Sequence, residues 1–300
     1  MLNVAGIGVE IRGDLDDGFE DAFLSTFSKR YLPDVSMRKS TVNVVIKRRK
    51  GKSFRVFGAL YDNHGVDEYI IESPPPKAYE NESPVFFLLQ AVARAGAKLG
   101  KIFLTDSASI LKDNEGILFL GYPHSGKSTL SSLALAEGFP VLSTENTVVE
   151  VRNGKLYITG GTSVLVYDPV IEEIYGVKLP YDEVTRSGYR IKSVEDPKRA
   201  EILGKGVKVS LIVVLHSAFN CKGFSFSEVK GRKVRKTLWY FATSLVKGVD
   251  YYEPRPLDLP ITPEIWEELE NFLNAAGSVR IIEAFGNHRE ILLGIINDEV

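Results

Sequence analysis

Residues 117–130 read ILFLGYPHSGKSTL, an apolar run followed by a loop bounded by glycines. The spacing from Gly121 to Gly126-Lys127-Ser128 matches G-x-x-x-x-G-K-[ST], the pattern of a loop that binds nucleotide phosphates. Glycines let the backbone adopt positive φ, so that successive N–H groups point into one concavity. The next segment, STLSSLALAEG, predicts a helix whose positive N-terminus lies behind the phosphates. The order strand, loop, helix therefore predicts a nucleoside phosphate site.

The loop motif predicts ATP and Mg²⁺ as ligands. Lys127 would reach the β- and γ-phosphates, and the hydroxyl of Ser128 would complete the coordination of Mg²⁺. We expect the lysine to be exposed in the empty loop. His124 is interpreted as a variable loop residue near phosphate rather than a general base. The predicted nucleotide-binding residues are Gly121, Tyr122, Pro123, His124, Ser125, Gly126, Lys127, Ser128 and Thr129.

Composition narrows the class of protein. With 300 residues, 44% hydrophobic and 25% charged, the chain is typical of a soluble globular protein, and a formal charge of −2 gives no electrostatic reason to expect nucleic-acid binding. A single cysteine, Cys221, excludes an intrachain disulfide and favours the cytoplasm. We expect no secretory leader and no membrane span, because no apolar stretch reaches roughly 18 residues. The scarcity of Gln, Cys and Met is typical of thermophilic proteins.

The first 76 residues predict an N-terminal α/β unit. Residues 2–12 resemble one strand, and aromatic residues at positions 19, 23, 27 and 31 mark one face of a helix. The segments VNVVIKRR and SFRVFGALY predict a hairpin around Lys50-Gly51-Lys52. Residues 73–76, Ser-Pro-Pro-Pro, are the best candidate linker.

Residues 84–300 predict a kinase core with a mixed β-sheet. A helix begins at Ser83-Pro84, and after the loop helix a strand at 141–143 is followed by a hairpin around Asn153-Gly154, with no helix between them. Regular strand–helix alternation would give a parallel sheet, so this order predicts much antiparallel pairing. Farther along, VKVSLIVVLH predicts a central strand, residues 230–247 and a segment from Pro263 predict helices, and VRIIEA and ILLGIIN predict two closing strands.

This order of elements resembles the HPr kinase/phosphorylase-like fold, which is related to phosphoenolpyruvate carboxykinase and whose archaeal members include free L-serine kinases. The resemblance covers about residues 84–160. In that family two adjacent aspartates follow the strand after the loop helix, where this chain has Thr144-Glu145. The resemblance therefore implies that Glu145 serves the metal and accepts the proton of the substrate hydroxyl. It also nominates Asp106, where bacterial members often have histidine, and Arg186 in TRSGYRI.

The chemistry also follows from the residues alone. Phosphoryl transfer needs a phosphate cradle, a cation and a group that orients the nucleophile, and Glu145 at the end of the neighbouring strand can supply the last of these. Asp168 is a competing metal ligand, because it ends the apolar strand VLVYD, although the following Pro169 fits a simple turn equally well. His288 is interpreted as a turn residue.

We expect a kinase that phosphorylates the hydroxyl of a small molecule, with free L-serine as the acceptor implied by the resemblance. The departures at Thr144-Glu145 argue against a protein kinase or phosphorylase of the HPr type without excluding phosphoryl transfer. A third alternative is a regulatory protein that binds nucleotide and transfers nothing. The sequence leaves open whether the phosphate donor is ATP, ADP or pyrophosphate, and whether the chain forms homo-oligomers.

Overall fold

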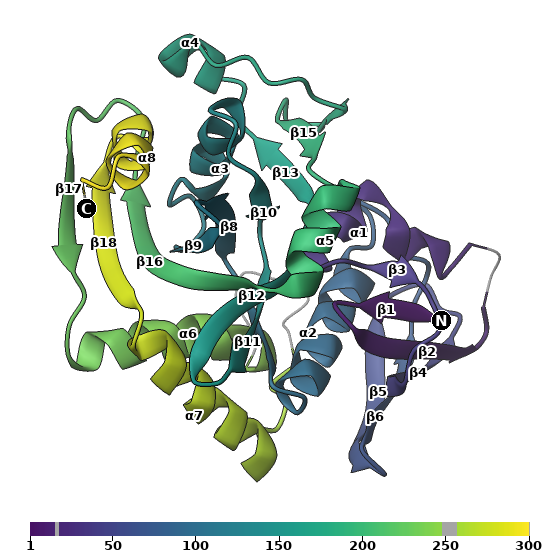
Figure 1. The fold of residues 1–300 in the computed structure, drawn as a ribbon. Helices are drawn as coiled ribbons and strands as arrows, with labels where there is room; N and C mark the ends of the chain where they lie inside the picture. The colour runs from purple at the N-terminus through teal and green to yellow at the C-terminus, as the bar shows by residue number, and fades with distance from the viewer. Residues whose placement is uncertain (16–17, 248–256, 300) are drawn as a thin grey trace. The chain divides into compact units, whose positions relative to one another are not determined.

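The computed structural model describes residues 1–15, 18–247 and 257–299 and shows a mixed α/β protein with several mixed sheets (Figure 1). The contacts divide the chain into two compact units, Met1–Phe103 with Ala242–Glu270, and Leu104–Phe241 with Asn271–Val300. This division differs from the predicted boundary near residue 76, because α2 (Ser83–Ala97) and residues 242–270 group with the N-terminal part of the chain.

The first unit is built on a six-stranded sheet in the order β3-β1-β2-β4-β6-β5. The helix α2 packs against β2, β4 and β6 and is buried along almost its whole length, which is why it belongs to this unit. The strands are β1 (Leu2–Val4), β2 (Ile7–Gly13), β3 (Ser36–Met37), β4 (Val42–Arg49), β5 (Arg55–Asn63) and β6 (Val66–Glu72). Two short helices, η1 (Asp21–Leu24) and α1 (Thr26–Tyr31), lie between β2 and β3.

The predicted hairpin between VNVVIKRR and SFRVFGALY is wrong. The strand β4 runs parallel to both β2 and β6, whereas β5 pairs antiparallel with β6 at the edge of the sheet. Burial explains this order, because half of the residues of β4 are buried, whereas every residue of β5 is exposed or half-buried. The tight turn lies instead between β5 and β6, where His64 and Gly65 have positive φ.

Two other N-terminal predictions are corrected. The single strand over residues 2–12 is broken into β1 and β2 by Ala5 and Gly6, which both have positive φ. The predicted aromatic helix is two short helices, because the Ser25 hydroxyl accepts the N–H of Ser28 and starts α1 anew.

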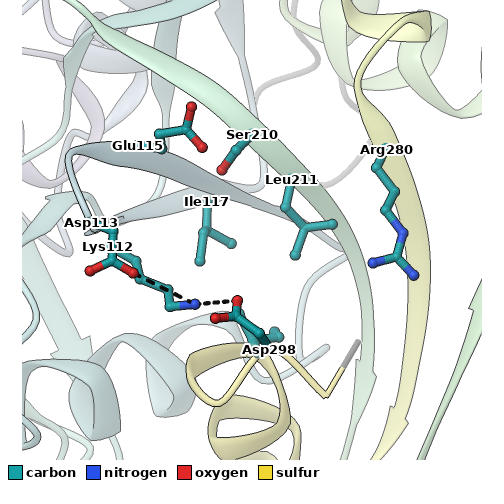
Figure 2. Close-up of a pocket in the computed structure, with 9 residues that line it drawn as sticks. Lys112, Asp113, Glu115, Ile117, Ser210, Leu211, Arg280 and Asp298 are labelled. Carbon is teal, nitrogen blue, oxygen red and sulfur yellow. Dashed lines mark hydrogen bonds and ion pairs between the residues drawn. The ribbon is translucent and has the colours of Figure 1, made fainter.

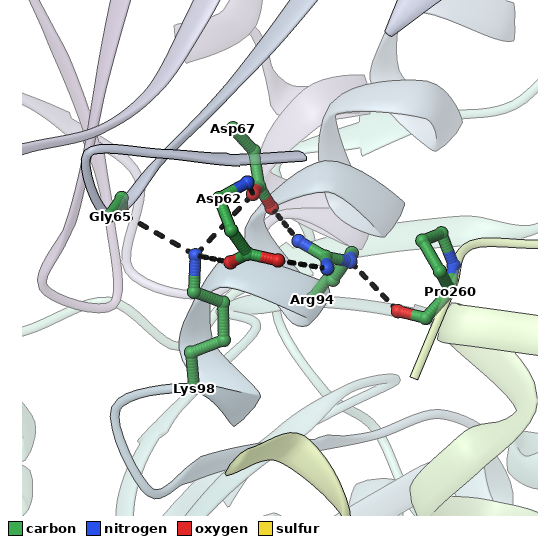
Figure 3. A network of polar contacts seen from close by, with 6 residues as sticks. All are labelled: Asp62, Gly65, Asp67, Arg94, Lys98 and Pro260. Atoms are coloured by element: carbon green, nitrogen blue, oxygen red, sulfur yellow. Dashed lines mark hydrogen bonds and ion pairs between the residues drawn. The ribbon is translucent and has the colours of Figure 1, made fainter. Parts of the chain in front are cut away.

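A buried network of charges holds α2 in this unit (Figure 3). The side chains of Arg94 and Asp67 are both fully buried and form an ion pair, and Arg94 Nη2 lies 3.0 Å from Asp62 Oδ2. Arg94 Nε also donates to the backbone oxygen of Pro260 at 2.9 Å. One turn earlier on α2, Gln90 bonds to the backbone of Leu245 and Leu257. These bonds join α2 to Leu245, Leu257 and Pro260, which explains why a distant stretch of sequence belongs to this unit.

The second unit contains a large mixed sheet, as the sequence predicts. The strand β9 (Glu115–Leu120) pairs antiparallel with β8 (Ser107–Lys112) and parallel with β16 (Val207–Ser217), and β16 pairs parallel with β18 (Arg280–Gly286). Farther out, β10 (Val141–Ser143) pairs antiparallel with β8, and β11 (Thr147–Arg152) with β12 (Lys155–Gly161). The predicted turn of this last hairpin is present, with positive φ at both Asn153 and Gly154.

Helices cover this sheet. The helix α3 (Lys127–Ala136) and the C-terminal helix α8 (His288–Ile296) pack against each other and share one hydrophobic core with β9, β16 and β18. The remaining elements are β7 (Lys101–Leu104), β13 (Val164–Tyr167), α4 (Ile171–Tyr175), β14 (Glu183–Val184), β15 (Arg190–Ser193), α5 (Pro197–Lys205), β17 (Phe224–Glu228), α6 (Arg232–Lys247) and α7 (Pro263–Gly277).

The predicted final strand ILLGIIN is wrong, because this segment is the helix α8. The Asn287 side chain accepts the N–H groups of Arg289 and Glu290 and so caps the helix. Ile291, Leu292 and Ile295 are buried at helical spacing, which puts one apolar face on the core.

Candidate functional site

The candidate site lies at one edge of the large sheet in the second unit. Because β9, β16 and β18 are parallel, their carboxyl ends meet at this edge. The strand β8 runs the opposite way and begins there, and β10 runs opposite to β8 and ends there. The phosphate loop, Asp106 before β8 and Glu145 after β10 therefore come from different parts of the sequence to the same edge, where open α/β sheets bind ligands.

The phosphate loop has the backbone of an anion cradle. Gly126 has a φ of 95° and begins α3 without a capping side chain, which leaves the first N–H groups of the helix available to a ligand. The Ser125 hydroxyl oxygen is buried without a hydrogen-bond partner in the described part of the chain. Gly121 is needed for space, because a Cβ there would lie 2.3 Å from that hydroxyl oxygen. Residues 121–129 thus fit a bound phosphate group.

The phosphate-loop lysine is buried, and the prediction that it is exposed is wrong. Lys127 is 6% exposed, and its Nζ donates to the backbone oxygens of Gly121 and Tyr122, the latter at 3.2 Å. Burial lowers the pKa of Lys127, while the negative charges of Glu145 and Asp106 oppose that shift. The loop therefore holds a cation that backbone dipoles and nearby carboxylates satisfy only in part.

Asp106 and Glu145 both lie close enough to act on this cation. Asp106 Oδ1 is 3.9 Å from Lys127 Nζ, its residue is 2% exposed, and its backbone oxygen accepts the N–H of Gly121 at 3.1 Å. Glu145 is half-buried and accepts the N–H of Ser107 through its backbone oxygen at 3.0 Å. The structure thus brings together three of the four predicted catalytic residues.

The loop that carries Glu145 is fixed by its neighbours. The hydroxyl of Thr162 accepts the backbone N–H of Glu145 at 2.8 Å. Thr144 is 2% exposed and its hydroxyl donates to the backbone oxygen of Val164 at 2.9 Å. Thr144 therefore builds the loop, although the resemblance places a carboxylate at its position.

A series of hydrogen-bonded, buried hydroxyls connects the strands next to Asp106 and Glu145. The Ser109 and Ser143 oxygens lie 2.6 Å apart, Ser143 and Thr147 2.6 Å apart, and Ser107 donates to Thr147 at 2.8 Å. Sequence analysis does not find these residues as a group, because they come from three strands. These hydroxyl–hydroxyl hydrogen bonds tie β8, β10 and β11 together and so fix the distance between Asp106 and Glu145.

His288 is a second residue of this site that sequence analysis misassigns. It is 2% exposed, and its Nδ1 shares a hydrogen bond of 2.9 Å with the hydroxyl of Tyr175. A Cβ on Gly126 would lie 2.5 Å from His288 Nε2 and 2.1 Å from the Ser217 hydroxyl oxygen. Burial lowers the pKa of His288 to about 4, so the ring is neutral at pH 7. His288 and Ser217 therefore form a close-packed wall behind the loop, and only glycine fits at position 126. In the sequence, Asn287 as a helix cap before the apolar segment ILLGII was the signal that could have placed His288 at the start of a helix.

Two other predicted residues lie elsewhere. Arg186 is exposed in the turn between β14 and β15, which belong to a separate three-stranded sheet. The Asp168 carboxylate accepts the N–H of Val170 at 2.9 Å at the start of α4, which agrees with the turn interpretation.

The metal prediction depends on Ser128 and Glu145. Ser128 is half-buried at the second residue of α3. Within the described ranges, no group of three or more His, Cys, Asp or Glu side chains could hold a metal ion. The residues present fit Mg²⁺, which usually keeps several waters and takes only one or two protein oxygens together with substrate phosphates.

A cavity lies where β9, β16 and β18 begin, at the opposite end of these strands (Figure 2). It has a volume of about 270 Å³, and its lining includes the apolar residues Ile117 and Leu211. Its lysine is already paired, since Lys112 forms ion pairs with both Asp298 and Asp113. This cavity lacks the backbone cradle of the phosphate loop.

No protein-family model matches this chain, and no curated protein matches its sequence. No helix in the described part of the protein is both long and apolar enough to cross a membrane.

Proposed function

We propose that this protein is an ATP- and Mg²⁺-dependent kinase of the HPr kinase/phosphoenolpyruvate carboxykinase type, and that it phosphorylates the hydroxyl group of a small molecule. The observation that carries this proposal is the meeting of Lys127, Asp106 and Glu145 at the mouth of a phosphate loop. A buried lysine beside two carboxylates is what the transfer of a charged group needs, since phosphoryl transfer depends on positioning and charge neutralisation.

In this proposal each residue of the site has a separate role in phosphoryl transfer. The uncapped backbone N–H groups at the start of α3 and the Lys127 ammonium hold the triphosphate, and Ser128 with Glu145 would hold Mg²⁺. The metal, when bound, neutralises charge on the phosphate oxygens. Glu145 accepts the proton of the acceptor hydroxyl while the hydroxyl oxygen forms a bond to the γ-phosphorus. The bond between the γ-phosphorus and the bridging oxygen breaks, and ADP leaves with that oxygen. Lys127 stabilises the negative charge that the ADP oxygen acquires.

The identity of the phosphate acceptor is proposed from the family resemblance and not from the geometry of the site. Free L-serine is proposed from the family resemblance, and an HPr-type protein substrate is the alternative within the same chemistry. The test is to incubate the protein and Mg²⁺ with ATP, ADP or pyrophosphate and a panel of amino acids and sugars. We expect O-phosphoserine and ADP to form in equal amounts when serine and ATP are both present. Formation with a sugar and not with serine would reject the acceptor and keep the kinase.

One observation favours a second function, a nucleotide-binding switch without transfer. Thr144 occupies a position where the resemblance expects a carboxylate, and its hydroxyl is used to build the loop. The two functions differ in a single measurement. A switch binds ATP tightly and forms no ADP with any member of the panel, whereas the kinase forms ADP only with its acceptor.

A further inference from the structure

An exposed aromatic residue lies inside the phosphate loop. Tyr122 is 52% exposed and directly follows the first glycine of the loop. Its ring centroid lies 5.0 Å from that of Tyr240 and 5.8 Å from that of Phe241, both in α6. Large aromatic side chains usually bury most of their surface, so a half-open ring at the rim of a ligand site indicates a surface kept for contact.

The backbone keeps this aromatic group next to the cradle. Phe241 is 1% exposed, and its backbone oxygen accepts the N–H of Thr105, the residue before Asp106, at 3.4 Å. The backbone oxygen of Tyr122 accepts a hydrogen bond from Lys127 Nζ at 3.2 Å. The backbone of Tyr122 is thus held by the lysine that would meet the phosphates, and its ring lies against α6.

The geometry of the rings leaves one aromatic surface open. The planes of Tyr122 and Tyr240 are tilted by 55°, and those of Tyr122 and Phe241 by 43°, so neither neighbour covers Tyr122 face to face. Tyr240 and Phe241 meet edge to face at 90°, which braces the cluster from the α6 side. A flat heterocycle can stack on such a face, whereas a phosphate group gains nothing from it.

We infer that Tyr122, supported by Tyr240, is the base-binding surface of the nucleotide site, and that the purine ring of the nucleotide stacks on it. The inference rests on the proposed function, because it requires that the phosphate loop binds a nucleoside triphosphate. It adds to that function a source of affinity that the phosphates do not supply. A nucleotide therefore binds more tightly than an inorganic chain of the same charge.

The test compares ATP with inorganic tripolyphosphate, each with Mg²⁺, by calorimetry on the full chain. In Tyr122→Leu we expect the affinity for ATP to fall about 5- to 150-fold, the effect of losing one stacked base, while the affinity for tripolyphosphate stays within about twofold. Tyr122→Phe keeps the aromatic face and should bind ATP like the wild type. Tyr240→Leu should shift ATP binding in the same direction by a smaller factor.

Phe57→Leu is the matched control, because Phe57 is an aromatic residue of similar exposure (56%) on the edge strand β5 of the first unit. Its binding of both ligands should be unchanged. Equal losses for ATP and tripolyphosphate in Tyr122→Leu, or no loss for either, would overturn the base site and leave the phosphate loop standing. If the wild type binds neither ligand, the proposed function fails and the base site with it.

Discussion

Arg94 in the first unit and Lys127 in the second are both buried cations with two carboxylates nearby, yet the protein treats them in opposite ways. Arg94 forms direct ion pairs with Asp67 and Asp62, and its pKa is raised because these bonds outweigh the effect of burial. Lys127 bonds to two backbone oxygens, the Asp106 carboxylate is 3.9 Å away, and burial lowers the pKa of the lysine. The first cation is satisfied by the fold, and the second keeps capacity for a ligand.

This contrast gives a criterion for telling a structural charge from a candidate ligand-binding one. A buried charge whose donors all have partners stabilises one conformation, and removing it leaves an unpaired partner. A buried charge that is only partly satisfied costs stability in the empty protein, and it is retained where a ligand of opposite charge completes it.

Replacing Lys127 should give the largest functional effect with little change in stability. Lys127→Met keeps the length and apolar part of the side chain, and we expect turnover to fall by about three to five orders of magnitude, as for other cations that stabilise phosphoryl transfer. Since burial already disfavours the charged lysine, the free energy of unfolding should change by no more than about 1 kcal/mol. Turnover assays measure the first effect, and denaturant unfolding measures the change in the free energy of unfolding. A fully active variant would remove the basis of the loop assignment.

Glu145→Gln should reduce kcat by about two to four orders of magnitude, because the amide cannot accept the proton of the hydroxyl, while nucleotide affinity stays near normal. Asp106→Asn is the matched variant at the other carboxylate near Lys127. If Glu145→Gln stays active and Asp106→Asn is inactive, the base lies before β8 and the assignment to Glu145 is mistaken.

Arg94→Met should show the opposite pattern to Lys127→Met. It leaves the fully buried Asp67 without its main partner, so the unfolding free energy of the first unit should fall by about 3–5 kcal/mol, and affinity for nucleotide should persist in whatever protein remains folded. The double variant Arg94→Met with Asp67→Leu should recover much of the loss, because both buried charges are then gone. A single variant as stable as the wild type would show that the network is not the structural charge described above.

Acid should weaken the second unit through His288. The pKa of His288 is lowered to about 4 in the folded protein, so between pH 6.5 and 4 the unfolded chain binds a proton that the folded chain does not. Stability is therefore lost as the pH falls through this window, by at most about 3 kcal/mol. Unfolding curves at several pH values should show the loss in the wild type and a smaller one in His288→Phe. An equal slope in both proteins would assign the effect to other groups.

Local patterns predicted much of the fold because they depend on neighbours in the sequence. The loop before α3, the Asn153-Gly154 turn and the run of β16 were all found this way, since turn chemistry and apolar runs are properties of a few adjacent residues. The order β4-β6-β5 was missed because it depends on which strand tolerates the exposed edge of the sheet. The helix α8 was missed because a short apolar run fits a strand as well as a helix until its cap is recognised.

The candidate site also has some features that the sequence predicted and others that depend on packing. The phosphate-loop motif can be read directly in the sequence, and strand order nominated Glu145, whereas Asp106 was nominated by the family resemblance. The folded structure was needed to show that Lys127 is buried, that hydroxyls from three strands bond to one another near Asp106 and Glu145, and that His288 and Ser217 pack behind Gly126. The physical reason is that burial, and the pKa shifts that follow from it, depend on every element that packs around a side chain, and those elements are far apart in the chain.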